Sequence, residues 1–266
     1  MKMLNNYIQE YQNTGELNDN FHQQFTAATD TIPILKEHRD YIEKNKLGFG
    51  DRAFHYMWYL ILEELKKNFS RVNMLEIGVY KGQVISLWSL LSKRMGLLST
   101  INAITPLSGN IPKNRLAGNR YVLKLKALFS SRFRKCLAEG NQYPIEDYES
   151  IVRSLFKRFE QNFDDIKIYR GYSTNPEIVT AVKNEKFNLI YIDGDHSYQG
   201  VVNDLNNYAP LVVDGGYLVM DDASWFLEGS VFWKGHKEVS RACDKIEEMG
   251  FKNILNVGHN RIYKKQ

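Results

Sequence analysis

Carboxylates and an imidazole follow two apolar runs in the second half of the sequence. The run 187–192 is followed directly by a small polar group, made of Asp193, Gly194, Asp195 and His196. The run 215–220 is followed by two more acidic residues, Asp221 and Asp222. If the runs are neighbouring strands, these carboxylates repel one another unless a cation or protons intervene. Hard oxygen ligands suit Mg²⁺ or a similar divalent ion, so the pattern predicts a metal site made of Asp193, Asp221 and Asp222.

His196 follows the first of these runs and is placed to act on such a site. A neutral imidazole beside a hydroxyl group held by the metal would make a good general base. The simpler alternative is that Asp195 and Asp222 are solvated helix caps and that His196 is a structural hydrogen-bonding residue. That alternative accounts for one carboxylate after each apolar run, but it does not explain why two carboxylates, Asp221 and Asp222, follow the second run.

Small residues follow two other predicted strands. Glu76 is followed by a G-x-x-x-G turn at Gly78 and Gly82, which differs from the G-x-G-x-x-G pattern that holds a pyrophosphate. An acidic residue before the turn suits a cationic amino group better than a phosphate. A later strand ends in a glycine and a hydroxyl that could hold an adenine edge, in the tripeptide Gly171-Tyr172-Ser173. The alternative for this tripeptide is a plain turn into a capped helix.

The elements that must position these residues alternate between strand and helix. Strand character occurs at 72–82, where the strand runs into the first glycine turn, and at 99–105, 166–173, 187–193 and 215–222. Helical spacing occurs at 52–69, 83–95, 175–184, 200–212 and 236–250. This alternation predicts an α/β fold with a Rossmann-like, doubly wound, mostly parallel sheet, whose ligands bind beyond the carboxyl ends of the strands. Segments 251–257 and 260–265 predict a closing antiparallel hairpin.

Length and composition agree with one large domain. The chain has 266 residues, 43% of them hydrophobic, and its 16 Tyr and 14 Phe can fill a sizeable core. The net charge is only +4, so bulk charge does not indicate a nucleic-acid-binding protein. Cys136 and Cys243 lack metal-ligand spacing, which favours reduced thiols in a cytoplasmic protein. The polar N-terminus differs from a signal peptide, and no apolar run is long enough to span a membrane.

Two regions depart from the α/β pattern. Residues 1–45 are patchily amphipathic and predict an N-terminal helical appendage to a domain at 46–266. A helical insert is predicted at about 107–163, and basic residues crowd its middle: Lys113, Arg115, Arg120, Lys124, Lys126, Arg132, Arg134 and Lys135. We expect the insert to form a lid or to pack in a homo-oligomer. The alternative is that its basic face docks an acidic carrier protein or an acidic substrate.

Several of these motifs occur together in one family. The order and spacing of "LEIGVYKG", "GYS", "IYIDGDHSYQGVVNDL" and "PLVVDGGYLVMDD" resemble class I S-adenosylmethionine-dependent methyltransferases. The closer resemblance is to metal-dependent O-methyltransferases, such as catechol O-methyltransferase and the sugar O-methyltransferases of macrolide and aminocoumarin biosynthesis. It covers roughly residues 48–265. The pair His55-Tyr56 also resembles a segment that precedes the first strand in the sugar-modifying members.

The resemblance implies a role for each matching residue. Glu76, the backbone at Gly78 and the glycine turn through Gly82 would hold the methionyl end of S-adenosylmethionine. Tyr80 matches a tyrosine that contacts the cofactor in the catechol enzyme, and Tyr172 and Ser173 would meet the adenine. Asp193 would lie beside the cofactor and would bind Mg²⁺, or another divalent cation, together with the pair that follows the fifth strand. Members of the family use either the position of His196 or that of Asp195 as the base, and we favour His196.

One position departs from the family pattern. The second strand usually ends in an acidic residue that binds both ribose hydroxyls, but this chain has Thr105 there. The function that the resemblance implies is O-methylation of a small molecule with a vicinal diol, either a sugar or a catechol-like natural-product intermediate. The alternatives are a metal-independent methyltransferase and a non-catalytic binding module with the same fold.

Overall fold

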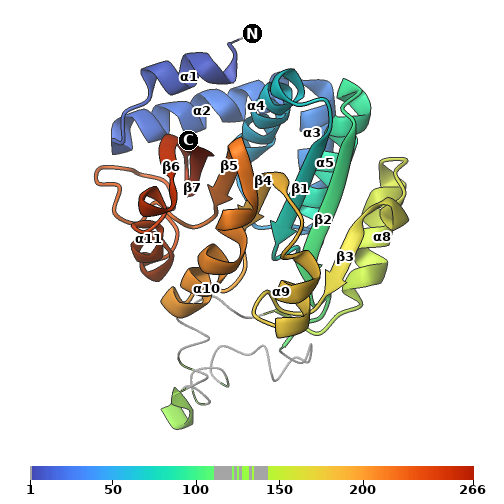
Figure 1. The fold of residues 1–266 in the computed structure, drawn as a ribbon. Coiled ribbons are helices and arrows are strands. Elements are labelled where there is room, and N and C mark those ends of the chain that lie inside the picture. Colours follow the sequence, from blue (N-terminus) through green and yellow to red (C-terminus); the bar gives the residue numbers. More distant parts are fainter. Residues whose placement is uncertain (1, 111–121, 123–124, 126–127, 132–133, 135–142) are drawn as a thin grey trace.

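A mixed sheet forms the centre of the structure (Figure 1). The computed structural model describes residues 2–110, 122, 125, 128–131, 134 and 143–266. In this part of the chain the sheet has seven strands in the order β3-β2-β1-β4-β5-β7-β6. The strands are β1 (Val72–Ile77), β2 (Ser99–Thr105), β3 (Lys167–Arg170), β4 (Phe187–Ile192), β5 (Val212–Met220), β6 (Phe251–Val257) and β7 (Asn260–Lys265). Strands β1 to β5 pair in parallel, whereas β7 is antiparallel to both β5 and β6. The predicted Rossmann-like sheet and its closing hairpin are confirmed.

Helices cover both faces of this sheet (Figure 1). The helices of the described chain are α1 (Leu4–Glu10), α2 (Gly15–Thr31), α3 (Pro33–Asn45), α4 (Ala53–Asn68), α5 (Gln83–Met95), α8 (Tyr148–Arg158), α9 (Pro176–Val182), α10 (Tyr198–Tyr208) and α11 (Lys237–Cys243). Short 3₁₀ turns are η1 (Phe163–Asp165), η2 (Ala209–Leu211) and η3 (Glu247–Met249). None of the described helices combines the length and apolar character that crossing a membrane requires.

Alternating side chains of β4 show how the two faces are filled. Leu189 and Tyr191 belong to the core on the side of α4 and α5, whereas Ile190 and Ile192 belong to the core on the side of α10 and α11. This alternation follows from the two-residue period of a strand. A strand that is buried on both faces must be apolar throughout, which is why residues 187–192 form a continuous apolar run.

The N-terminal helices belong to the first of these cores. Phe21, Phe25 and Leu35 are at most 1% exposed and lie in the same apolar cluster as Trp58 of α4. Residues 4–45 therefore contain three helices, as predicted, and these helices share the core of the sheet. The boundary at residue 45 remains a prediction.

The predicted insert lies only partly within the described residues. Its second half contains α8 and η1. Most of the basic residues that would dock an acidic partner lie outside the described residues: Lys113, Arg115, Arg120, Lys124, Lys126, Arg132 and Lys135. The two ends of the segment 111–142 are joined, because the amide of Asn110 donates to the Tyr143 carbonyl and the Tyr143 amide donates to Oδ1 of Asn110, both at 2.8 Å.

Candidate active site

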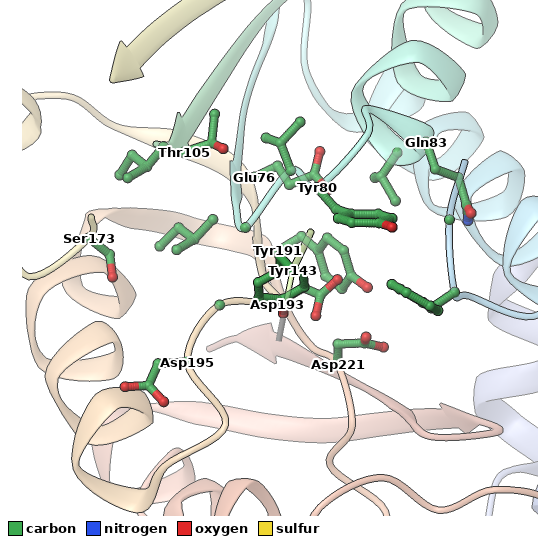
Figure 2. A pocket seen from close by; sticks show the side chains of 18 of the residues that line it. Glu76, Tyr80, Gln83, Thr105, Tyr143, Ser173, Tyr191, Asp193, Asp195 and Asp221 are labelled. Carbon is green, nitrogen blue, oxygen red and sulfur yellow. The ribbon is translucent and has the colours of Figure 1, made fainter. Parts of the chain in front are cut away.

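One cavity of about 660 Å³ lies at the carboxyl ends of the parallel strands. Every residue predicted for the site lines it except Gly82; the lining set contains Glu76, Gly78, Tyr80, Thr105, Tyr172, Ser173, Asp193, Asp195, His196, Asp221 and Asp222. Figure 2 shows many of these side chains around the same hollow. His55 does not line the cavity, since it is fully buried beneath α3 and bonds to His38 instead.

The tips of β1 and β4 meet at Gly78. Its φ is +94°, and a Cβ at this position would lie 1.8 Å from the carbonyl oxygen of Asp193. The Asp193 amide in turn donates to the Ile77 carbonyl at 2.8 Å. Only glycine allows this close backbone approach together with a positive φ. The first glycine of the turn therefore sets where Asp193 enters the cavity.

Glu76 is a buried carboxyl at the end of β1. It is 2% exposed, and its Oε2 accepts a hydrogen bond from the amide of Ile85 at 3.1 Å. Burial raises the pKa of Glu76 well above its usual range, and the nearby charge of Asp193 adds to this rise. A bound cation in the cavity would offset the cost of ionising Glu76.

An aromatic wall stands beside the glycine turn. The ring of Tyr80 lies 4.9 Å from Phe49, 5.7 Å from Tyr143 and 5.6 Å from Tyr148, measured between centroids. Gly82 does not line the cavity; its φ is +86°, it precedes α5, and a Cβ there would lie 2.9 Å from Val152. Gly82 therefore packs against Val152 of α8, and its predicted role toward the cofactor stays a prediction.

The tips of β2 and β3 provide hydroxyls. Thr105 is 3% exposed, and its Oγ1 accepts from the amide of Leu107 at 3.2 Å. Ser173 lines the cavity, and its carbonyl accepts from the Tyr208 hydroxyl at 2.6 Å. Tyr172 is 63% exposed at the cavity. Asn175 stands at the N-cap position of α9, but its side chain accepts from the Tyr172 amide at 2.9 Å and makes no capping hydrogen bond to the helix.

The carboxylates that follow β4 and β5 come together as the sequence predicts. Burial raises the pKa of Asp221 well above its usual range, and the charges of Asp193 and Asp222 raise it further. Burial also raises the pKa of Asp193, while His196 partly offsets that rise. The part of Asp193 that is exposed faces the cavity. The carboxylates of this cluster therefore repel one another unless protons or a cation neutralise part of their charge.

Histidines surround this acidic pair. His196 Nε2 lies 3.6 Å from Asp222 Oδ2 and 3.8 Å from Asp193 Oδ1. His236 Nε2 lies 3.5 Å from Asp222 Oδ2, and the His196 and His236 rings stack with centroids 4.6 Å apart. His259 Nε2 lies 3.3 Å from Asp221 Oδ1. Sequence reasoning missed His236 and His259, because isolated histidines after the fifth strand have no spacing that links them to the pair.

Asp195 faces different surroundings from His196. Its Oδ1 accepts from the Ser197 amide at 2.9 Å, and its carboxyl group packs against Gly200 at the start of α10. Ser197 itself caps α10 by accepting from the Gly200 amide. Figure 2 shows the Asp195 side chain apart from Asp193 and Asp221. The structure thus brings His196 to the acidic cluster and leaves Asp195 at the helix end.

The loop after β5 returns to the acidic pair. The Trp233 indole donates to Asp222 Oδ1 at 3.1 Å, and the His236 amide donates to the Asp222 carbonyl at 2.8 Å. The Asp222 backbone has a φ of +53°, which is uncommon for a residue other than glycine. Helix α2 holds the same loop, because Asp19 accepts from the Ser230 hydroxyl and the Val231 amide at 2.6 and 2.8 Å.

Comparison with known protein families shows which family this chain belongs to. A family described as "Methyltransferase domain" matches residues 75–223, which is more than half of the chain. The chain belongs to this methyltransferase family. The matched segment begins on β1 before the glycine turn and ends just beyond the acidic pair, so it contains the cavity-lining tips of β1, β2, β3, β4 and β5.

Individual relatives are more distant. A protein of Acanthamoeba polyphaga mimivirus, described as "Uncharacterized protein R132", is 29% identical over 184 residues, which is 68% of this chain and 64% of that protein. The match thus spans less than two thirds of its length. The O-methyltransferase NovP has a TM-score of 0.55 at 15% identity, over 80% of this chain and 79% of NovP. An O-methyltransferase from Bacillus cereus, in complex with SAH, has a TM-score of 0.53 at 14% identity. The match covers 92% of this chain and 99% of the Bacillus cereus chain. At such identities these two structures establish a common fold.

Proposed function

We propose that this methyltransferase-family protein transfers the methyl group of S-adenosylmethionine to a hydroxyl of a small-molecule vicinal diol, with the help of a divalent cation. The observation that carries the proposal is that the acidic cluster and His196 share one cavity with the glycine turn and Glu76. NovP and the Bacillus cereus enzyme are both O-methyltransferases, which supports oxygen as the methyl acceptor.

The cofactor would lie along the tips of β1 to β4. Glu76 would face the positively charged methionyl end, which gives its buried carboxyl group the cationic partner it needs. Gly78 leaves room for close approach to the backbone, and Tyr80 would cover the methionyl end. The adenine would lie toward Ser173 and Tyr172, with Thr105 the side chain nearest to a ribose by its position on β2.

The acidic cluster fits a divalent cation. Oδ1 of Asp221 is buried and makes no hydrogen bond to any described residue, and burial raises the pKa values of Asp193 and Asp221. Asp193, Asp221 and Asp222 are the residues that would hold the cation. When bound, it would supply a Lewis acid that lowers the pKa of an acceptor hydroxyl, while S-adenosylmethionine would supply the methyl group.

His196 is the proposed general base. Its Nε2 points between Asp193 and Asp222, so an acceptor hydroxyl beside the acidic cluster would lie within reach of the ring. The neighbouring carboxylates would stabilise the imidazolium that forms when His196 takes the proton. The aromatic residues Trp233 and Tyr143 line the cavity beside the cluster and would exclude water from the acceptor. Positioning of the two reactants would provide much of the rate.

Calorimetry and a turnover assay test this function. The intact protein is titrated with S-adenosylmethionine and with SAH, with and without Mg²⁺, and then assayed on catechol and on sugar diols. We expect cofactor binding without metal, and methyl transfer that stops on addition of EDTA. Cofactor binding with turnover that EDTA leaves unchanged would indicate a metal-independent methyltransferase. Absence of cofactor binding would favour a non-catalytic binding module.

A further inference from the structure

The two oxygens of Asp222 face different groups. Oδ2 lies near His196 and His236, at 3.6 and 3.5 Å. Oδ1 accepts from the Trp233 indole and lies 3.8 Å from Nε2 of His259. One side of the pair Asp221 and Asp222 therefore faces His196, the proposed base, and the His236 ring that stacks on it. On the other side, Asp221, Asp222 and His259 each offer an atom within 4.8 Å of the other two.

His259 is held firmly on that second side. It lies in the turn between β6 and β7, is 5% exposed, and its carbonyl accepts from the Ala223 amide at 2.8 Å. The Phe54 ring and the imidazole pack in a T-shaped arrangement, with their centroids 4.7 Å apart. Nδ1 of His259 makes no hydrogen bond to any described residue, and Nε2 lies 3.3 Å from Asp221 Oδ1. A buried imidazole fixed in this way is positioned to offer Nε2 to an ion at the pair.

We propose that His259 is a ligand of the catalytic cation together with Asp221 and Asp222, and that the centre therefore prefers a borderline transition-metal ion, such as Co²⁺ or Zn²⁺, to Mg²⁺. Imidazole is a common ligand of transition metals, whereas Mg²⁺ is bound mainly by oxygen. The proposal rests on the proposed function, because it concerns the cation of that site. It leaves His196, on the other oxygen of Asp222, available for proton transfer.

Affinity measurements on the intact protein give the first test. Calorimetric titrations with Co²⁺ and Mg²⁺ are compared for the wild type, His259→Asp and His22→Gln; His22 is a control histidine that bonds to Asp51. We expect the wild type to bind Co²⁺ at least about 10²-fold more tightly than Mg²⁺. His259→Asp should lower that ratio at least about tenfold by replacing nitrogen with oxygen, and His22→Gln should preserve it. An unchanged ratio in His259→Asp would overturn the proposal.

A spectroscopic measurement covers the case in which His259→Asp does not fold. Pulsed electron paramagnetic resonance of wild-type protein loaded with Mn²⁺ detects ¹⁴N nuclei bound directly to the ion. We expect nitrogen coupling that persists in His196→Ala, in His236→Ala and in His22→Gln. Absence of the coupling in the wild type, or its loss in His196→Ala or His236→Ala, would refute ligation by His259. Mg²⁺-supported turnover without nitrogen coupling would refute this inference and leave the proposed function intact, whereas failure to bind any divalent ion would refute both metal statements.

Discussion

His196 and Asp195 are neighbours in the sequence, yet their side chains meet different parts of the molecule. His196 approaches Asp222 and Asp193, whereas Asp195 accepts a hydrogen bond from the Ser197 amide at the start of α10. The motif alone could not separate these two candidates for the base. Their separation comes from the turn that joins β4 to α10, where the cap residue Ser197 fixes the backbone direction.

The first prediction compares His196→Ala with Asp221→Asn. His196→Ala should lower kcat about 10²–10⁴-fold, the usual contribution of a general base, with cation and cofactor affinities nearly unchanged. Raising the pH should restore part of its rate, because the acceptor hydroxyl then ionises without help. Asp221→Asn should weaken cation binding and methyl transfer together. Turnover against pH and titrations with the cation and SAH distinguish the two effects.

Two outcomes would change this reading. If Asp221→Asn keeps full cation affinity, the acidic pair is not the cation site. If His196→Ala keeps full activity while Asp195→Ala loses it, Asp195 is the base, and the turn before α10 must rearrange when the acceptor binds.

The second prediction concerns Thr105, whose place on β2 would face the ribose. A carboxylate can accept two charge-assisted hydrogen bonds from a diol, whereas threonine offers one hydroxyl. Thr105→Asp should therefore tighten binding of SAH in calorimetric titrations. Thr105→Asn has a similar shape without the charge and should tighten binding less. Equal or weaker affinity in Thr105→Asp would mean that another residue already binds the ribose.

Strand tips and helix starts are the elements that assemble the cavity. The sequence predicted them closely, because β2, α5, β6 and β7 occupy the ranges that periodicity indicates: 99–105, 83–95, 251–257 and 260–265. It could not predict the contact of α2 with the loop after β5, because Asp19 and Ser230 are separated by 211 residues and neither belongs to a motif. The N-terminal helices thus help to fix the loop that carries Trp233 to Asp222.

The third prediction tests the meeting of β1 and β4 with Gly78→Ala. A Cβ at Gly78 would lie 1.8 Å from the Asp193 carbonyl, whereas one at Gly96, which also has a positive φ, would meet no atom within 4 Å. Gly96→Ala should cost about 1–2 kcal/mol from its left-handed backbone alone. Gly78→Ala should cost roughly 1–3 kcal/mol more and should also weaken SAH and cation binding. Urea denaturation and calorimetry measure both effects; equal losses in the two variants would contradict the close approach.

Over the whole molecule, buried polar groups connect the N-terminal helices to the methyltransferase core. His38 Nδ1 lies 2.9 Å from His55 Nε2, and His38 Nε2 lies 3.0 Å from the Ser86 hydroxyl. Since Ser86 donates to the Gln83 carbonyl, it accepts from His38, and His38 in turn accepts from His55. Each histidine therefore has a neutral tautomer that fits these hydrogen bonds. A proton added to Nδ1 of His38 would break the bond from His55, and a proton added to His55 would place a buried charge at Nδ1.

The fourth prediction is a loss of stability in acid. Burial lowers the pKa of His38 to about 3 and that of His55 well below its usual range. From about pH 6.5 down to pH 3, the unfolded chain binds protons at these sites that the folded chain does not, so stability falls as the pH falls. The slope should approach about 1.4 kcal/mol per pH unit for each histidine below pH 6. Urea denaturation from pH 7.5 to 5 should show a shallower slope in His38→Gln; identical slopes would place the acid sensitivity elsewhere.

The sequence predicted the sheet more completely than it predicted the side chains that line the cavity. Apolar runs and glycine turns predicted the sheet and placed Asp193, Asp221 and Asp222 at one edge, because parallel strands end on the same side. His236 and His259 reach the same place only through the loop after β5 and the β6–β7 turn. Such convergence depends on tertiary packing, which no local pattern in the sequence encodes.

The two hydrogen bonds between Asn110 and Tyr143 also bear on how far the segment between these residues can vary. The two ends of the segment 111–142 are already joined where they leave the cavity. The free-energy cost of closing a chain segment rises by only about 0.6 kcal/mol for each doubling of its length. Replacement of this segment by one of different length or composition would therefore leave the sheet, the glycine turn and the acidic pair in place.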